Sequence, residues 1–339
     1  MRPSLTKERV LMIAGFVLSA ALAVYFLRRV DLGELGPTLS SVNLWILSAC
    51  LLTKGAVLSL GALRSKVFLR PLRRYRFIEC FTAILGGYVT NNVFPFRLGE
   101  LVRLDLLARA GEISRGSTVA VVGLERLLDL ISFLILFALV VPLLAVDLSG
   151  DRGLAWLLGL ILAALLAVGW FAANPHRFPG LVVFVSRPFS PGIQAWLVQK
   201  SQRFVDGLSA LRSSRAVAEA LALTFAIRLV GMLTIQCWLW AFGLDLPLYA
   251  PLIVMVFLSV GTMVPSSPGF IGTFHVAVAY ALELLGLDPS AAASVAIAGH
   301  FMATVPWTIF GLIVSLPAIR SVWKRSGAGP QRVEPAFRG

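Results

Sequence analysis

Charged residues are scarce in this chain of 339 residues: they make up 14% of the sequence, whereas hydrophobic residues make up 58%. Soluble domains carry about 25% charged and about 45–50% apolar residues, so this composition excludes a soluble enzyme of ordinary domains. Cysteine and histidine are also rare, with 3 residues of each. The cysteines lie far apart in apolar runs without a CxxC pair, which argues against a disulfide framework and a zinc site. So few histidines exclude a histidine-rich metal centre.

Sequence motifs for nucleotide binding and for hydrolysis are absent as well. The chain has no GxxxxGK[ST] loop, no GxGxxG after a strand, no HExxH and no GxSxG. We therefore expect no cofactor and no metal ion, and an energy source that is an ion gradient, a mass-action gradient or a partner protein. The formal net charge of +13 does not indicate nucleic acid, because the cytoplasmic loops of membrane proteins collect Lys and Arg.

Apolar stretches of about 20 residues, the length that spans a bilayer, recur along the chain and predict an all-α integral membrane protein with about six full crossings. The predicted crossings are Val10–Leu27, Leu44–Leu63, Ser117–Leu144, Leu154–Ala173, Ala216–Phe242 and Ala291–Ile319. The first stretch is not followed by a small-residue cleavage site and a polar mature chain. We therefore interpret it as a helix rather than a removed signal peptide. We expect residues 1–325 to form a single polytopic membrane domain and residues 326–339, rich in Gly, Pro and Arg, to form a flexible basic tail.

Positive charge indicates the orientation. Six Lys and Arg residues lie between Arg64 and Arg76, and such clusters stay in the cytoplasm. Together with the predicted crossings, this places both termini on the cytoplasmic side of a bacterial-type inner (plasma) membrane. The basic segment 177–212 then lies on the same side, where its apolar residues at helical spacing predict an amphipathic helix in the headgroup layer. A solvated connecting helix is the alternative for this segment.

Two further apolar stretches, Phe77–Phe96 and Pro251–Leu285, are interrupted by proline and glycine. The interrupting residues, which we take as hinges, are Pro95, Gly99, Pro265, Pro268 and Gly272. Charged residues follow the first stretch directly, and each ion in hydrocarbon costs several kcal/mol, so this stretch cannot continue across the membrane. We expect two broken, re-entrant helical hairpins, because irregular backbone at membrane depth is tolerated where protein or a wet cavity covers it.

The two broken stretches resemble each other. Pro95 and Pro265 are 170 residues apart (265 − 95), and Gly99 and Gly269 have the same offset (269 − 99). Three predicted crossings separate the stretches, an odd number, so they would enter from opposite faces. Repeat-like halves over about 77–145 and 250–319 would then form an inverted repeat, which in transporters points to the central binding site. A chance match of Pro and Gly is the alternative.

Charged residues also occur where hydrocarbon should exclude them. Glu125, Arg126 and Asp129 lie inside a predicted crossing, and the two carboxylates, four residues apart, share a helix face. One interpretation is a structural ion-pair cluster that locks this helix to the first hairpin. The other is that Arg126 faces an anionic group, since guanidinium grips phosphate in a fork that Lys cannot copy. Arg97 and Arg103, beside the helix that follows the first break, favour an anion site, with an ordinary cytoplasmic charge fringe as the alternative.

Polar residues around the breaks complete the candidate site. The candidate substrate-binding residues are Asn91, Asn92, Arg97, Glu100, Arg103, Glu125, Arg126, Asp129, Arg228, Ser266, Ser267, Gly269, His275 and His300. The two asparagines can satisfy unwound backbone or bind a hydroxyl group, and packing is the alternative role for each histidine. Arg228 is a candidate counter-ion of Glu125, Asp129 or Glu283. We identify no catalytic residue and no metal ligand.

Three runs of sequence resemble the signatures of a known family. They are Asn91–Arg103 (NNVFPFRLGELVR), Gly123–Asp129 (GLERLLD) and Val264–Gly272 (VPSSPGFIG). In this order they resemble the lysylphosphatidylglycerol synthase transmembrane-region family, also called flippase-like or UPF0104, over about residues 10–320. The chain is identified as a stand-alone member, because its sequence ends shortly after the last predicted helix, without the aminoacyl-transfer domain.

The resemblance implies a lipid-flipping membrane domain. We therefore expect a flippase that moves an anionic amphipathic lipid between leaflets (a phospholipid, or a polyprenyl-phosphate- or hopanoid-linked lipid), with its phosphate near Arg97, Arg103 and Arg126. The alternative is a membrane-embedded lipid-modifying transferase, with Glu125 or Asp129 as a base, or an accessory subunit of a lipid- or glycolipid-synthesis complex. The expected partners are an anionic membrane lipid and a lipid-synthesising or glycosyltransferase protein, and no nucleic acid.

Overall fold

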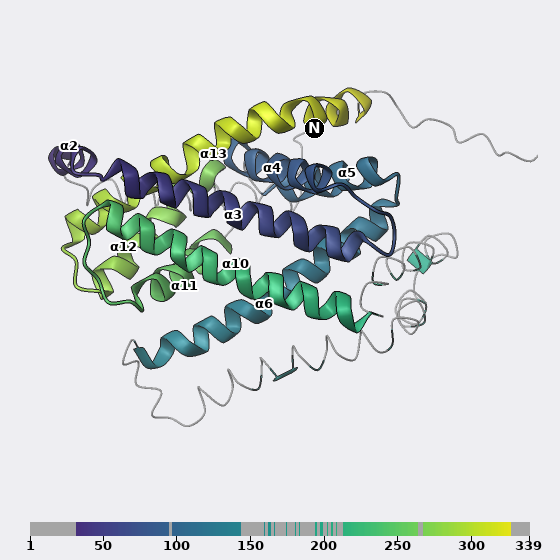
Figure 1. The fold of residues 1–339 in the computed structure, drawn as a ribbon, viewed down its shortest axis with the longest axis horizontal. Helices are drawn as coiled ribbons and strands as arrows, with labels where there is room; N and C mark the ends of the chain where they lie inside the picture. The colour runs from purple at the N-terminus through teal and green to yellow at the C-terminus, as the bar shows by residue number, and fades with distance from the viewer. Residues whose placement is uncertain are drawn as a thin grey trace, which may run out of the picture.

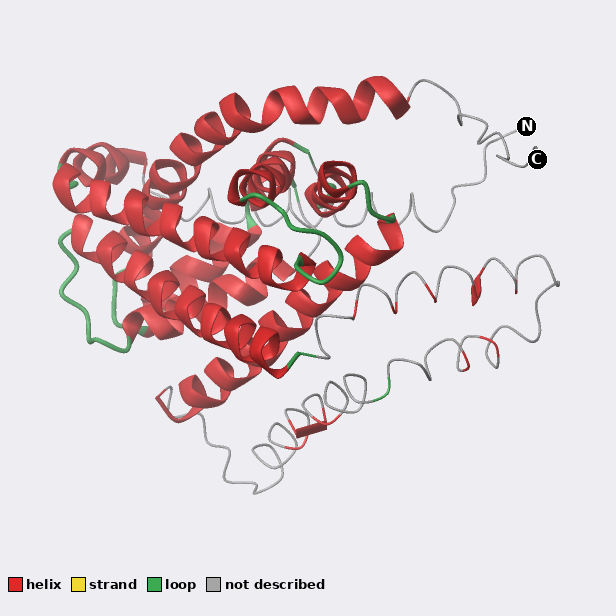
Figure 2. Cartoon of the chain, turned by 45° about the vertical axis from the view of Figure 1, so that its right-hand side comes forward, coloured by secondary structure: helices red, strands yellow, loops and turns green. Residues whose placement is uncertain are grey.

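The described part of the chain is built from helices alone. The computed structural model describes residues 32–94, 97–143, 213–263 and 267–326, together with scattered positions between 159 and 208. The elements are α2 (Leu32–Ser40), α3 (Leu44–Leu69), α4 (Phe77–Val93), α5 (Gly99–Gly111), α6 (Arg115–Leu143), α10 (Ser214–Ala241), α11 (Ala250–Met263), the 3-10 turn η2 (Pro268–Phe270), α12 (Thr273–Leu284) and α13 (Pro289–Ser326). Figure 2 shows helices throughout these residues, with loops only between them. The predicted all-α class is confirmed for this part of the chain.

Three of the described helices are long and apolar enough to cross a membrane: α3, α10 and residues 289–320 of α13. Between 11% and 28% of their most apolar windows is buried inside the protein, so most of these side chains face outward, as they do in lipid. The three helices coincide with the crossings predicted at 44–63, 216–242 and 291–319. The crossing predicted at 117–144 falls on α6, a 29-residue helix.

Several predictions fall on parts of the chain that the structure does not describe. The crossings predicted at 10–27 and 154–173, the amphipathic segment 177–212 and the tail beyond residue 326 lie outside the described residues, apart from isolated positions. The count of six crossings and the orientation of the termini therefore stay predictions.

Helices α3 and α10 run antiparallel along each other (Figure 1). At one end, the N–H of Asn43 donates to the carbonyl of Ala241 at 2.8 Å. At the other end, Arg70 forms an ion pair with Glu219 at 3.0 Å. We call the end with the arginine-rich α3–α4 loop (residues 70–76) the basic end.

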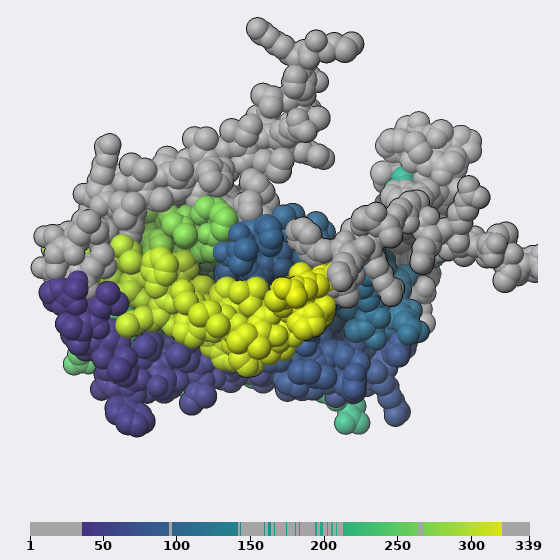
Figure 3. Space-filling model, turned by 90° about the horizontal axis from the view of Figure 1, so that it is seen from above, coloured from purple at the N-terminus to yellow at the C-terminus, as the bar shows by residue number. Residues whose placement is uncertain are grey.

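Two broken hairpins enter this bundle from its two ends (Figure 1). The first, α4–α5, has both outer ends at the basic end, and in the middle of the bundle α4 ends at Val93 and α5 begins at Gly99. The second, α11–α12, starts and finishes at the opposite end; α11 ends at Met263, and η2 precedes the start of α12 at Thr273. The predicted interruptions of both stretches are confirmed, and each half of the chain contains a long helix, a broken hairpin and a second long helix in the same order. Seen from above (Figure 3), α13 runs across the bundle beside α2 and α3.

Short polar side chains start the helices. The Asn43 side chain accepts from the N–H groups of Trp45 and Ile46 at 3.0 and 3.2 Å and so caps α3. Ser213 caps α10 in the same way, and Asp288 caps α13. These caps satisfy amide groups that have no partner within the helix.

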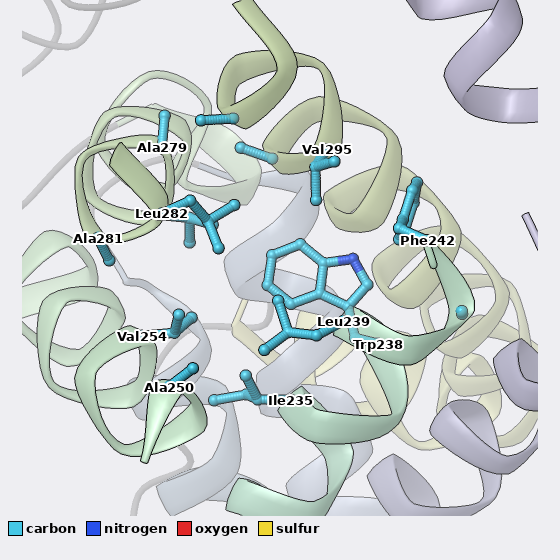
Figure 4. Close-up of a cluster of buried hydrophobic side chains, with 14 of the residues drawn as sticks. Ile235, Trp238, Leu239, Phe242, Ala250, Val254, Ala279, Ala281, Leu282 and Val295 are labelled. Atoms are coloured by element: carbon cyan, nitrogen blue, oxygen red, sulfur yellow. The ribbon is translucent and has the colours of Figure 1, made fainter. Parts of the chain in front are cut away.

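The described residues form two hydrophobic core clusters. One comes mainly from α10, α11, α12 and α13 and surrounds Trp238, with Leu239, Val254 and Leu282 fully buried (Figure 4). The other comes mainly from α3, α4, α5 and α6. The two clusters also share helices: α13 packs against α4 of the first hairpin as well as against α12 of the second.

Gly99 lets the two arms of the first hairpin approach each other. A Cβ atom on Gly99 would lie 1.9 Å from the carbonyl oxygen of Gly87 and 2.6 Å from the side-chain oxygen of Asn91. We expect Gly99→Ala to lower the free energy of unfolding by about 1–3 kcal/mol, the usual cost of overpacking, as measured by denaturant unfolding in detergent. Gly123→Ala in α6, where a Cβ meets nothing within 4 Å, is the control and should be neutral or stabilising. Equal stability of the two variants would contradict the close approach.

Candidate functional site

The tips of the two hairpins touch in the middle of the bundle. The Arg97 guanidinium donates to the carbonyl oxygen of Thr262, at the end of α11, and lies 5.5 Å from the centroid of the Phe270 ring. Arg97 and Phe270 both have left-handed backbone, with φ of 53° and 58°, which costs about 1–2 kcal/mol for each non-glycine residue. They are 173 residues apart (270 − 97). The two breaks therefore share an unusual conformation and hold each other.

Two asparagines fasten the first break. The Asn91 side chain accepts from the N–H of Gly99 at 2.8 Å and so caps α5 across the break. The Asn92 side chain donates to the Thr308 hydroxyl of α13 at 2.9 Å. Asn91 thus satisfies an amide group next to unwound backbone, one of the roles that the sequence predicts, whereas Asn92 joins the first hairpin to α13.

A cavity of about 340 Å³ lies beside the hairpin tips, within the size range of ligand pockets. Residues of α3, α4, α10, α11, α12 and α13, with Phe270 of η2, line it. Its polar wall consists of Lys54, Tyr88, Asn92, Arg228, Thr234, Ser259, Thr262, His300 and Thr304. Apolar side chains such as Trp238 and Phe274 form the rest. The cavity is therefore amphipathic and is shared by both halves of the chain.

The charge of the cavity wall is positive. Lys54 and Arg228 contribute cations, and no Asp or Glu is among the described lining residues. The ammonium of Lys54 lies 5.6 Å from the centroid of the Tyr88 ring, and no described carboxylate forms an ion pair with it. A cation within a membrane-spanning helix needs an anion or a wet cavity, so the Lys54 side chain marks this cavity as a candidate anion site.

Two ion pairs, one buried and one half-buried, join α6 to its neighbours near the basic end. The Arg103 guanidinium of α5 forms an ion pair with the Glu125 carboxylate, which is 1% exposed and also accepts from the Ser65 hydroxyl of α3 at 2.7 Å. Arg64 of α3 holds the Asp129 carboxylate through two hydrogen bonds of 2.8 and 3.2 Å. A buried carboxylate without such partners would be strongly destabilising.

Arg228 connects this ion-pair cluster to the cavity. Its guanidinium donates to the carbonyl oxygen of Asp129 and to the Ser132 hydroxyl, both at 2.9 Å, and lies 3.8 Å from the Asp129 carboxylate. Of the candidate counter-ions left open by the sequence, Asp129 is thus the one that contacts Arg228. The same side chain also lines the cavity.

The arginines predicted to bind phosphate already have partners. Arg103 pairs with Glu125, and Arg126 lies 3.3 Å from both Glu100 and Asp129 while its side chain stays 52% exposed. These contacts support the structural interpretation of the cluster, in which it locks α6 to the first hairpin. A direct role of Arg97, Arg103 and Arg126 in lipid binding stays a prediction.

The remaining predicted residues lie around the second break. The Ser267 hydroxyl donates to the carbonyl of Ile271 at 2.8 Å, and Gly269 and Gly272 have φ of 64° and 93°. His275 and His300 form a hydrogen bond of 3.0 Å between their rings. Pro268 opens η2, whereas the predicted residues Pro95, Pro265 and Ser266 lie outside the described residues.

Sequence reasoning missed several residues of the cavity. Lys54 and Tyr88 were not candidates, and neither were the hydroxyl residues Thr234, Ser259 and Thr304. A lysine near the middle of a predicted crossing is a usable signal. The hydroxyl residues give no such signal in the sequence, because Ser and Thr in apolar helices often donate to a carbonyl of their own helix, as Thr234 does. In the described part of the chain, no group of three His, Cys, Asp or Glu side chains could hold a metal ion.

Both hairpins and the cavity lie within a part of the chain that matches the model of a known family. The family model described as lysylphosphatidylglycerol synthase TM region matches residues 12–311. The chain belongs to this family. As a member of the lysylphosphatidylglycerol synthase transmembrane-region family with several membrane-length helices, it is a multi-pass membrane protein.

Two curated relatives are distant in sequence. Glycosyltransferase AglD of Haloferax volcanii is 27% identical over 331 residues, which cover 88% of this chain but 53% of the relative. The chain thus spans about half the length of that relative. The UPF0104 membrane protein MJ1595 of Methanocaldococcus jannaschii is 22% identical over 340 residues, 96% of this chain and 99% of the relative. No solved structure matches the chain.

The contribution of the Arg103–Glu125 pair to stability can be tested. Arg103→Met leaves the Glu125 carboxylate buried without its cation, so we expect the free energy of unfolding to fall by about 3–5 kcal/mol. Arg103→Met combined with Glu125→Gln removes both charges and should recover most of the loss. Arg76→Met, at an exposed pair with Glu79, is the control and should cost less than about 1 kcal/mol. Denaturant unfolding in detergent measures all three, and a double variant no more stable than Arg103→Met would contradict the pairing.

Proposed function

We propose that this protein moves an anionic amphipathic lipid between the two leaflets of a membrane. The headgroup lies in the cavity, near Lys54 and Arg228, while the hydrocarbon tails stay in the bilayer. The observation that carries the proposal is the cavity wall, whose described residues include cations and no carboxylate, beside the contacting tips of two broken hairpins. The candidate lipids are phospholipids and polyprenyl-phosphate- or hopanoid-linked lipids, which share an anionic headgroup on long hydrocarbon.

We propose that the two halves of the chain form an inverted repeat, within a protein of six crossings and two re-entrant hairpins. The antiparallel course of α3 and α10 and the entry of the hairpins from opposite ends support this symmetry (Figure 1). In the proposed orientation, the basic end and both termini face the cytoplasm, because the arginine-rich loop of residues 70–76 lies at that end.

Alternating access follows from this arrangement. Each break leaves backbone groups that hydrocarbon cannot satisfy, so a polar cavity or the other tip must meet them. A cavity open to both faces at once would leak ions. We therefore propose that the Arg97–Thr262 contact between the tips breaks and re-forms as the cavity opens to one face and then to the other.

The second candidate function is the membrane half of a lipid-glycosylation system. A relative named glycosyltransferase AglD supports it, since this chain spans about half of that protein. In this role the membrane domain presents a lipid-linked substrate to a glycosyltransferase partner. Chemistry within the membrane domain itself has less support, because the Glu125 carboxylate is buried and bound to Arg103 and Ser65, which leaves it poorly placed as a base.

Replacing Lys54 tests the cavity as an anion site. Lys54→Met should reduce the transfer of fluorescent phosphatidylglycerol in proteoliposomes by about 10-fold or more, the equivalent of one charge-assisted contact, while Lys54→Arg keeps most of the activity. Lys66→Met removes the same charge from the same helix outside the cavity and is the control. Transfer by Lys54→Met at the rate of the control would contradict the proposed headgroup site.

Cysteine accessibility tests alternating access and the transferase alternative together. Single cysteines at Leu98 and Ile271, which are 40% and 44% exposed at the two tips, would be labelled from each side of the membrane. Added anionic lipid should raise labelling at one position while it lowers labelling at the other. Constant labelling at both positions, together with lipid modification that depends on Glu125, would instead favour the embedded transferase.

A further inference from the structure

Two buried histidines form a hydrogen-bonded chain from the second break to the cavity wall. The N–H of Gly272, where α12 begins, donates to Nδ1 of His275 at 3.3 Å. Nε2 of His275 lies 3.0 Å from Nδ1 of His300, and His300 lines the cavity. The two side chains are buried, and the ring of Phe274 stacks on His300 with the ring centroids 4.1 Å apart.

These contacts decide which ring nitrogens carry hydrogen when both rings are neutral. Nδ1 of His275 accepts the Gly272 N–H, so the hydrogen of His275 is on Nε2. That N–H donates to Nδ1 of His300, which places the hydrogen of His300 on its own Nε2. Both Nδ1 lone pairs are therefore in use, and the chain of donors runs in one direction, from Gly272 toward His300.

One added proton breaks this chain. A proton on Nδ1 of His275 faces the Gly272 N–H, so two donors oppose each other at the start of α12. A proton on Nδ1 of His300 opposes the Nε2–H of His275. If the hydrogen of His275 moves from Nε2 to its own Nδ1 instead, that N–H and the N–H of Gly272 oppose each other. Either the bond between the rings or the bond to Gly272 is lost. Gly272 has φ of 93°, so the affected bond is at a turn that links the break to α12.

The charges that face the pair connect it to the content of the cavity. On the cavity wall, α3 contributes Lys54, α4 contributes Tyr88 and α10 contributes Arg228, whereas α11 contributes the hydroxyl residues Ser259 and Thr262 and no ionisable group. The positive charge of Lys54 opposes a second positive charge on His300. An anion bound beside Lys54 and Arg228 removes this opposition. The anion and the proton therefore favour each other's binding, and this coupling is reciprocal.

We propose that the His275–His300 pair is a proton-binding site, and that an anionic headgroup in the cavity and a proton on the pair bind together and release the turn at Gly272. This inference rests on the proposed function, and it makes the lipid transfer proton-coupled. Histidine suits this role because an unperturbed imidazole gains its proton closer to physiological pH than any other unperturbed side chain.

The site can be tested without transport. Protein labelled with ¹⁵N-histidine in nanodiscs of phosphatidylcholine should show His275 with its hydrogen on Nε2 at neutral pH. Replacing part of the phosphatidylcholine with phosphatidylglycerol should increase the protonated fraction of the pair at a fixed acidic pH. A hydrogen on Nδ1 of neutral His275, or a protonated fraction that does not respond to phosphatidylglycerol, would overturn the proposal.

Transfer of fluorescent phosphatidylglycerol in proteoliposomes tests the coupling. The wild-type rate should rise as the pH falls, by up to about 10-fold per pH unit, the limit for one coupled proton. His275→Asn with His300→Asn should lose this pH dependence, because Asn keeps an acceptor oxygen near the place of Nδ1 but does not titrate. His176→Asn, which replaces the third histidine of the chain, should keep the wild-type profile.

The outcomes separate the two proposals. Wild-type protein that transfers no fluorescent phosphatidylglycerol but shows the lipid-dependent protonation would contradict the proposed function and leave the proton site standing. Wild-type protein that transfers the lipid with the same pH profile as the double Asn variant would overturn the proton site alone.

Discussion

The structure depends on one constraint: polar groups inside an apolar bundle must find their partners within the protein. The two hairpin breaks raise this demand, since each ends a helix in the middle of the bundle. Arg97 and Asn91 meet part of it, by donating to the carbonyl of Thr262 and by capping α5. The carboxylates of Glu125 and Asp129 in α6 also need partners, and arginines from three other helices pair with them. These contacts tie the first hairpin to the second hairpin and to α6.

The partners are distributed unequally, and this divides the bundle into two regions. Near the basic end, Glu125 and Asp129 are held by several hydrogen bonds each, and a region built in this way resists rearrangement. Around the cavity the contacts are fewer: Lys54 faces an aromatic ring, and the tips meet through Arg97. Arg228 belongs to both regions. On the proposed function, the ion-pair cluster holds α6 in place while the hairpin tips beside the cavity move.

The sequence predicted the all-α class and the two interruptions, and it predicted Asn92, Arg228 and His300 among the residues that line the cavity. Long apolar stretches and paired Pro and Gly interruptions are local signals, so α3, α10, α13 and both breaks were predictable. Whether Arg103 faces a lipid or Glu125 depends on how α5 packs against α6, and no local signal carries that information. Lys54 could have been a candidate from its place in an apolar helix. Its neighbours on the cavity wall come from six helices, and only the tertiary structure shows that they meet.

The unequal charge of the cavity has an electrical consequence. On its wall, Lys54 forms no ion pair with a described carboxylate, whereas Arg228 lies 3.8 Å from the Asp129 carboxylate. A cavity without a bound anion therefore carries the fixed positive charge of Lys54, which a bound anion offsets. The membrane potential acts on charge that moves through the bilayer, by about 2.3 kcal/mol per elementary charge for each 100 mV. If the cavity wall moves through the bilayer, the membrane potential does work on its charge. This work differs between the protein with a bound anion and the protein without one, because the anion cancels part of the charge. On the proposed function, the charge of Lys54, which forms no ion pair with a described carboxylate, makes the membrane potential part of the driving force for the return of the empty protein.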